Sequence, residues 1–162
     1  MQRIDNDELI DFAAAAGIGA IAGLRSMTAP AAVSLAINQH RINTPNGRLA
    51  FLKSNKAAAT FTALAIGELI TDKLPNTPNR TSPPALTGRI LCGGLAGAAL
   101  CASRDRSIAV GALLGGVAAI AGAFLGYTIR KQIGRRLHAR DTVVAAFEDA
   151  IAVGGGALLV AS

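Results

Sequence analysis

Long apolar runs separated by short charged blocks dominate this sequence of 162 residues. A helix needs about 20 apolar residues to cross the hydrocarbon core of a bilayer, so runs of this length predict membrane-spanning helices. We expect the spans at 9–37, 57–74, 85–103, 107–129 and 142–161. Together they predict an all-α fold, a polytopic integral membrane helical bundle that forms a single membrane domain over residues 1–162.

The composition favours a surface that faces lipid. Hydrophobic residues make up 51% of the chain and charged residues 16%, whereas an ordinary soluble domain has roughly 25% charged residues. Trp is absent and aromatic residues make up only 4%, although spanning helices usually carry Trp and Tyr at the membrane interfaces. A soluble, alanine-rich helical domain is therefore the alternative.

The distribution of charge and the positions of Cys and His indicate which partners, metals and cofactors to expect. The net charge is +6, but the basic residues lie in short blocks between the apolar runs, where anionic lipid headgroups would meet them. We therefore expect the lipid bilayer as a partner and no nucleic acid. Cys92 and Cys101 share one apolar run at a spacing that fits neither a zinc site nor a redox pair, and His40 and His138 stand alone. The sequence thus predicts no metal site and no cofactor.

The first apolar run, 9–37, is too long for one untilted span and is interrupted in its middle. The interruption consists of polar residues and a proline: Arg25, Ser26, Thr28 and Pro30. Proline removes a backbone donor and disfavours helix in the residue before it. We expect a helix to about Leu24, a break across 25–30 and a second short helix to about Ile37, so that this segment either crosses broken or re-enters.

Acidic residues inside the apolar runs need partners, because a charge at mid-bilayer costs on the order of 2.5 to 3.5 kcal/mol. Glu68 and Asp72 lie four residues apart and share one helical face, with Lys73 beside them. Arg25 is the expected counter-ion, within ion-pair reach of one of the two, and the break at 25–30 should pack against the segment from Glu68 to Arg89. The alternative is an interfacial position at which these charges only hold loops.

Two further acidic residues, Glu148 and Asp149, lie inside the last run. Adjacent residues of a helix point about 100° apart, so only one of them can face the interior directly. A structural carboxylate in an ion pair and a proton carrier are both open interpretations.

Glycines four residues apart occur in three of the runs, at Gly19/Gly23, Gly93/Gly97, Gly111/Gly115 and Gly122/Gly126. Small residues at this spacing let helix backbones approach closely, which matters in lipid because the hydrophobic effect gives little drive between helices. The pattern predicts a tightly packed bundle or a homo-oligomer.

Three segments of the chain resemble one known family. They are GLRSMTAPA at 23–31, GELITDKLP at 67–75 followed by Pro78, Arg80, Thr81, Pro84, Gly88 and Arg89, and EDAIA at 148–152. They are similar to the bacterial membrane family DUF4126. The resemblance implies a small multi-pass protein of the bacterial inner membrane whose function is unknown, and it supplies no catalytic or ligand residues.

The leading functional hypothesis is transport or binding of a small anionic solute or a lipid headgroup. Broken helices expose backbone donors at bilayer depth, and Arg adds a forked cationic donor. The candidate binding residues are Arg25, Ser26, Thr28, Glu68, Asp72, Lys73, Arg80, Thr81, Arg89, Glu148 and Asp149.

Two alternatives come from other classes of protein. A membrane-embedded, lipid-modifying enzyme could use Glu68 or Asp72 as general base or metal ligand, but no third ligand or nucleophile has suitable spacing, so no catalytic residue is assigned and an enzyme is disfavoured. A structural or assembly protein would use its glycine seams to build an oligomer and its charges to lock the fold.

Overall fold

The computed structural model describes residues 6–43, 47–71, 82–137 and 141–161, with side chains for all of these except Arg48, 133–137 and 141–148. Within these ranges the chain is helical and contains no strand, which confirms the all-α class. The elements are α1 Asn6–Leu24, α2 Thr28–Asn38, the 3-10 helix η1 Gly47–Lys53, α3 Asn55–Thr71, α4 Pro83–Ser103, α5 Ile108–Leu137 and α6 Asp141–Ala161.

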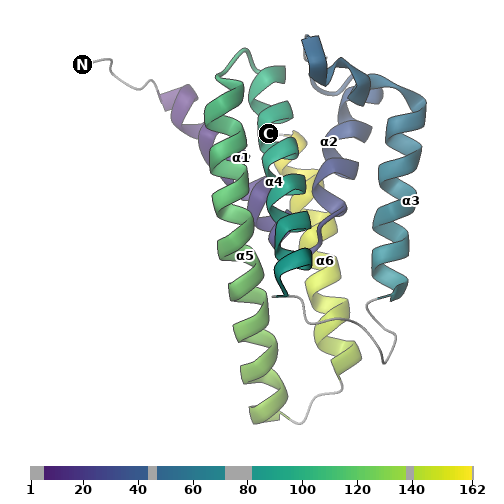
Figure 1. Cartoon of the computed structure of the whole chain (residues 1–162), viewed down its shortest axis with the longest axis vertical. Helices are drawn as coiled ribbons and strands as arrows, with labels where there is room; N and C mark the ends of the chain where they lie inside the picture. The colour runs from purple at the N-terminus through teal and green to yellow at the C-terminus, as the bar shows by residue number, and fades with distance from the viewer. Residues whose placement is uncertain (1–5, 44–46, 72–81, 138–140, 162) are drawn as a thin grey trace.

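The first two helices form a hairpin inside the bundle. In Figure 1, α1 runs downward from the end that holds the N-terminus, and α2 returns to that same end. Helices α3 to α6 then run alternately down and up, so that the chain ends near the level at which it began. Of the two arrangements expected for 9–37, the structure therefore has the one in which the segment turns back.

Polar contacts tie the helix ends together at the end that holds both termini. Asp11 in α1 accepts hydrogen bonds from Arg104 and Arg106 of the α4–α5 turn at 2.9 and 2.7 Å. This contact raises the pKa of the Arg106 guanidinium, mainly through the hydrogen bond to the carboxylate. Arg104 also donates to the carbonyl of Leu159 in α6 at 3.3 Å. The start of α1, the α4–α5 turn and the end of α6 are thus held at one level.

Glycine lets α1, α4 and α5 pack backbone against backbone. A Cβ built at Gly19 would overlap the carbonyl of Gly115, and one built at Gly97 would overlap the carbonyl of Gly111. At Gly93 the added Cβ would lie 2.6 Å from the oxygen of Gly115. No residue larger than glycine fits these positions without separating the helices.

Helix α2 occupies the centre of the other half of the bundle. Its buried side chains include Val33 and Ile37, which join a core cluster with residues of α1, α4 and α6. The buried hydroxyl of Ser34 donates to the carbonyl of Leu52 at 2.7 Å, which fixes η1 over the end of α2. Because the main contacts of α3 are with α2 and η1, α3 forms the outer wall of this half.

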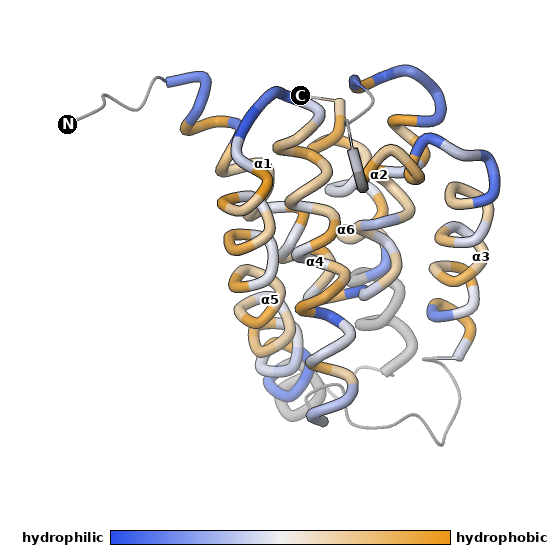
Figure 2. Tube along the Cα trace, turned by 45° about the horizontal axis from the view of Figure 1, so that its top comes forward, coloured by the Kyte–Doolittle hydropathy of each residue, from blue (hydrophilic) through white to orange (hydrophobic). Residues whose placement is uncertain are grey.

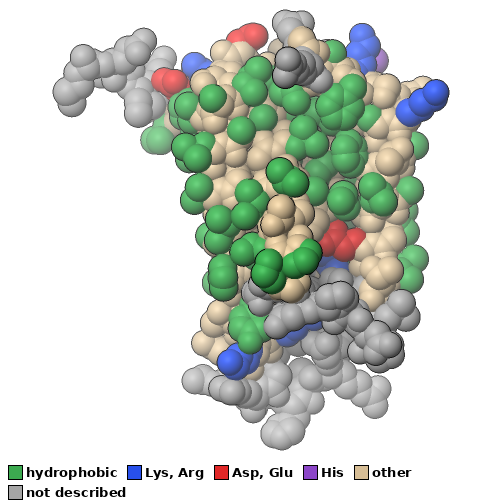
Figure 3. Space-filling model, viewed as in Figure 1, with side chains coloured by type: hydrophobic (Ala, Val, Ile, Leu, Met, Phe, Trp, Pro, Cys, Tyr) green, Lys and Arg blue, Asp and Glu red, His purple; other side chains and the backbone are tan. Residues whose placement is uncertain are grey.

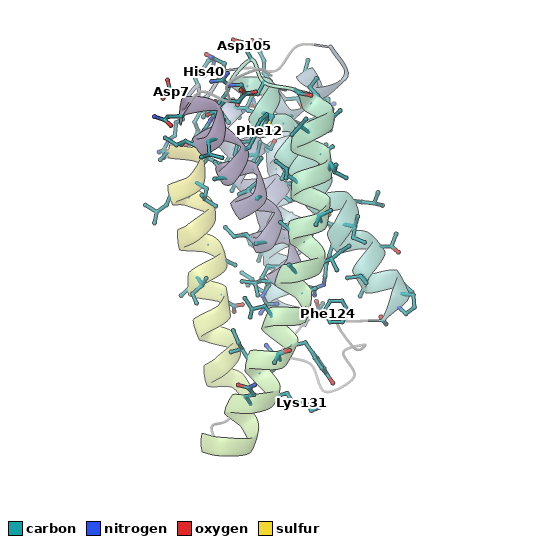
Figure 4. All side chains as sticks on the ribbon, turned by 90° about the vertical axis from the view of Figure 1, so that its left-hand side faces the viewer. Asp7, Phe12, His40, Asp105, Phe124 and Lys131 are labelled. Atoms are coloured by element: carbon teal, nitrogen blue, oxygen red, sulfur yellow. The ribbon has the colours of Figure 1, made fainter. Side chains whose placement is uncertain are left out.

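On the face drawn in Figure 3, hydrophobic side chains cover much of the flank, Lys, Arg, Asp and Glu side chains lie at the upper end, and one acidic patch interrupts the flank. Figure 2 shows the same trend along the chain, with mostly hydrophobic residues in the helices and hydrophilic ones at the upper end. Figure 4 shows Asp7, His40 and Asp105 at one end and Lys131 toward the other. Many large apolar side chains on the flanks are exposed, such as Leu113 at 67% and Leu158 at 73%.

By length and composition, two helices of the described part could cross a membrane. They are Pro83–Ser103, with a mean hydropathy of 1.5, and Ile108–Gln132, with 2.3. Helix α5 continues to Leu137, past the end expected at 129, because Arg and Lys are good helix formers and no proline interrupts the basic block.

Candidate functional site

The turn between α1 and α2 creates two helix ends in the interior of the bundle. Helix α1 ends at Leu24 and α2 begins at Thr28, so Pro30 lies in the first turn of α2, where its missing N–H group is not needed. The expected break therefore spans fewer residues than 25–30. The residue before α2, Met27, has no side-chain cap, so the N–H groups at this helix end need a partner from elsewhere in the fold.

Glu68 of α3 supplies that partner. Its two carboxylate oxygens accept hydrogen bonds from the backbone N–H groups of Ser26 and Met27, each at 2.8 Å. A carboxylate is favourable here for two reasons. It satisfies two donors that have no partner within the helix, and its negative charge opposes the positive end of the α2 dipole.

Arg89 of α4 serves the other helix end. Its Nη1 donates to the carbonyl oxygens of Gly23 and Leu24, the latter at 3.0 Å. Helix α1 has no basic residue in its own last turn, so the cation that opposes the negative end of its dipole comes from a different helix. The side chain of Arg89 is 4% exposed. The expected packing of the break against the segment from Glu68 to Arg89 is thus confirmed at both ends of that segment.

Arg25, in the turn itself, is completely buried and forms an ion pair with Asp149 of α6. The expected partners were Glu68 and Asp72. Glu68 is instead engaged by the backbone of the turn, and Asp72 lies outside the described residues. Asp149 can take the guanidinium because α6 packs against both hairpin helices. Of the two adjacent acidic residues in α6, Asp149 therefore faces the turn, while the side chain of Glu148 is outside the described set.

The hairpin turn thus gathers two cations and two anions from four parts of the chain, here called the tip cluster: Arg25, Glu68, Arg89 and Asp149. Its formal charge is zero, and each member touches a charge or a helix end of opposite sign. Among the other candidate residues, Ser26 contributes its N–H group and Thr28 starts α2 as a buried residue. Lys73, Arg80 and Thr81 lie outside the described residues.

Two sulfur atoms lie in contact beside the tip cluster: the thiol of Cys92 in α4 is 4.0 Å from the thioether sulfur of Met27. Within the described part of the chain, no group of three His, Cys, Asp or Glu side chains comes together as a metal site would require.

A pocket of about 530 Å³ lies beside the tip cluster, between α2, α3 and α6. Its lining reaches from Thr28 at the start of α2 to Gln39 and Arg41 just beyond the end of that helix, and it includes none of the four charged side chains of the tip cluster. Sequence reasoning missed this pocket. The alanines of α2 were the available signal, but alanine is equally typical of a closely packed face.

One protein-family model matches residues 12–162, and its description is "Domain of unknown function (DUF4126)". No curated protein and no solved structure matches the chain.

Proposed function

The chain belongs to the DUF4126 family, and we propose that it is a multi-spanning membrane protein. From the geometry of the hairpin turn, we further propose that it binds a small anion there and passes it across the bilayer. The proposal rests mainly on the two hydrogen bonds that the carboxylate of Glu68 accepts from the backbone N–H groups of Ser26 and Met27. The protein's own anion occupies a position at which a free anion would be stabilised by the same donors.

The membrane part of the proposal is supported by α4 and α5, which are long and apolar enough to cross. It is also supported by the many large apolar side chains that are exposed on the flanks, since extensive exposed apolar surface marks sites of contact with a membrane or with another protein. Helices α3 to α6 would cross the bilayer and the α1–α2 hairpin would re-enter from one side. Irregular backbone at membrane depth is tolerated where protein buries it, as it does at this turn.

The anion-binding part rests on three features of the turn. The backbone N–H groups of Ser26 and Met27, directly before α2, donate to a negative charge, the positive end of the α2 dipole lies beside them, and the buried cations Arg25 and Arg89 belong to the same cluster. Removal of the Glu68 carboxylate without replacement would leave two partly buried donors without partners, which is unfavourable. A free anion that enters as Glu68 leaves would avoid that penalty, so binding and displacement are coupled.

Anion flux into proteoliposomes tests the proposal, with chloride and formate as the probes. Glu68→Gln removes the internal anion and should raise the flux several-fold, because the amide oxygen binds the two N–H groups more weakly than a carboxylate does. Asp105→Asn is the matched control, since Asp105 is exposed in the α4–α5 turn, and it should leave the flux unchanged. An absence of flux in both the wild-type protein and a folded Glu68→Gln variant would reject transport.

A structural role is the second candidate, and one observation favours it. Arg25 is buried and paired, and the neighbouring pocket does not reach the tip cluster. In that case the charges only lock the hairpin into the bundle, and the glycine seam of α1, α4 and α5 carries the packing of a scaffold or a homo-oligomer. Loss of stability in tip-cluster variants without any anion flux in the wild-type protein is the outcome that selects this role.

A further inference from the structure

The pocket between α2, α3 and α6 has the shape of an elongated apolar groove. Helix α2 forms its floor and carries alanines there, including Ala32 and Ala36, while Ala65 of α3 and Ala157 of α6 line its walls. These small side chains leave a space of about 530 Å³, within the roughly 300–1,000 Å³ that is common for small-molecule sites.

The two ends of the groove differ in polarity. Arg41 and Gln39 line the end that lies level with the start of α3 (Figure 1), whereas Thr28 and Leu69 line the opposite end. The segment 39–56, which leads from the end of α2 into the start of α3, is strongly basic: it contains Arg41, Arg48, Lys53 and Lys56 and no acidic residue. A positively charged mouth over an apolar interior is complementary to an anionic amphiphile.

The length of the groove corresponds to one bilayer leaflet. From Thr28 to Gln39 it follows eleven residues of α2, or about 16 Å at 1.5 Å per residue. Half of the hydrocarbon core measures about 15 Å. One acyl chain, extended along α2 from the polar mouth, would therefore fill the groove as far as Thr28.

From these observations we propose that the groove holds one acyl chain of an anionic phospholipid, with the phosphate at Arg41. The proposal rests on the membrane location given under the proposed function, but not on anion transport. It assigns a lipid site to a face of the protein that is separate from the tip cluster.

Native mass spectrometry of the detergent-purified protein tests the site, with phosphatidylglycerol and phosphatidylcholine of identical acyl chains as probes. The wild-type protein should retain phosphatidylglycerol about fivefold better, as expected for one cation near the headgroup. Arg41→Gln should abolish this preference, whereas the control Lys53→Gln, at the same end but outside the lining, should keep most of it. Equal retention of the two lipids by the wild-type protein would overturn the charge assignment.

A second pair of variants tests the groove itself. Ala157→Phe fills the groove from α6 and should lower retention of both lipids about tenfold, whereas Ala150→Phe adds the same ring at an exposed alanine of α6 outside the lining. Similar retention in the two variants would overturn the acyl-chain site. If Ala157→Phe does not fold, crosslinking of the wild-type protein with phosphatidylglycerol that carries a photoreactive acyl chain decides instead. Labelling should concentrate on α2, α3 and α6, and labelling of the exposed face of α5 to the same extent would reject the site.

The same preparations separate this proposal from the proposed function. A protein that purifies from the aqueous fraction without detergent refutes the membrane location and both proposals with it. A membrane-bound protein that conducts anions but retains no lipid refutes only the lipid site.

Discussion

Replacement of Arg25 by methionine should lower the free energy of unfolding by about 3–5 kcal/mol, the usual range when one partner of a buried ion pair is removed. The guanidinium is fully buried, and the Asp149 side chain that it neutralises is only 16% exposed. Without Arg25, the Asp149 carboxylate stays in the interior with its charge uncompensated. The matched control is Arg106→Met, which removes a guanidinium that is 30% exposed and should change stability far less, because exposed ion pairs contribute little.

A double-mutant cycle tests whether Asp149 is the partner that matters. Neutralisation of both groups, as Arg25→Met with Asp149→Asn, should recover much of the loss, so that the coupling free energy amounts to about 2 kcal/mol or more. The cycle of Arg25→Met with Glu68→Gln should give a smaller coupling, because Glu68 is held by backbone N–H groups. Unfolding would be followed by circular dichroism during denaturant titration in mixed micelles. A coupling to Asp149 below about 0.5 kcal/mol, or one smaller than the coupling to Glu68, would refute this account of the turn.

Gly115→Val should destabilise the bundle by several kcal/mol, because the added side chain would meet the backbone of Gly93. Gly154→Ala should instead stabilise α6 by up to about 1 kcal/mol, because the space around the added Cβ is open and alanine favours helix more than glycine does. Both changes are measured by denaturant titration. Ser34→Ala should cost about 1 kcal/mol by removing the hydrogen bond to Leu52, and faster proteolysis in 39–53 would report the release of η1. Asp11→Asn should cost less than about 1 kcal/mol, an effect that weakens in high salt, because its partners are partly exposed.

The sequence predicted those structural features that depend on residues close together along the chain. The end of α1 at Leu24 follows from the polar residues after it, and the helical class follows from the length of the apolar runs. The restart of the helix at Thr28 was harder to predict, because proline is both a helix breaker and an acceptable first-turn residue. The local pattern alone does not distinguish these two roles at Pro30.

Partners across the fold were less predictable. Glu68 precedes Asp149 in sequence order and shares a face with Asp72, so it was the natural counter-ion for Arg25. Whether a carboxylate meets a guanidinium or a helix end depends on how α3 and α6 are placed around α2, and no local pattern contains that information. The groove escaped prediction for the same reason, because the alanines of α2 do not reveal that α3 and α6 stand apart over them.

The two helix ends at the hairpin turn are completed by residues that the ribosome adds much later. Glu68 and Arg89 follow the turn by more than 40 and 60 residues, and Asp149 lies near the C-terminal end of the chain. Until these side chains arrive, the backbone groups of the turn and the charge of Arg25 lack these protein partners, and in the membrane location that we propose hydrocarbon would provide none. We therefore expect the hairpin to stay near the aqueous interface during synthesis and to settle into the bundle last, although it is made first.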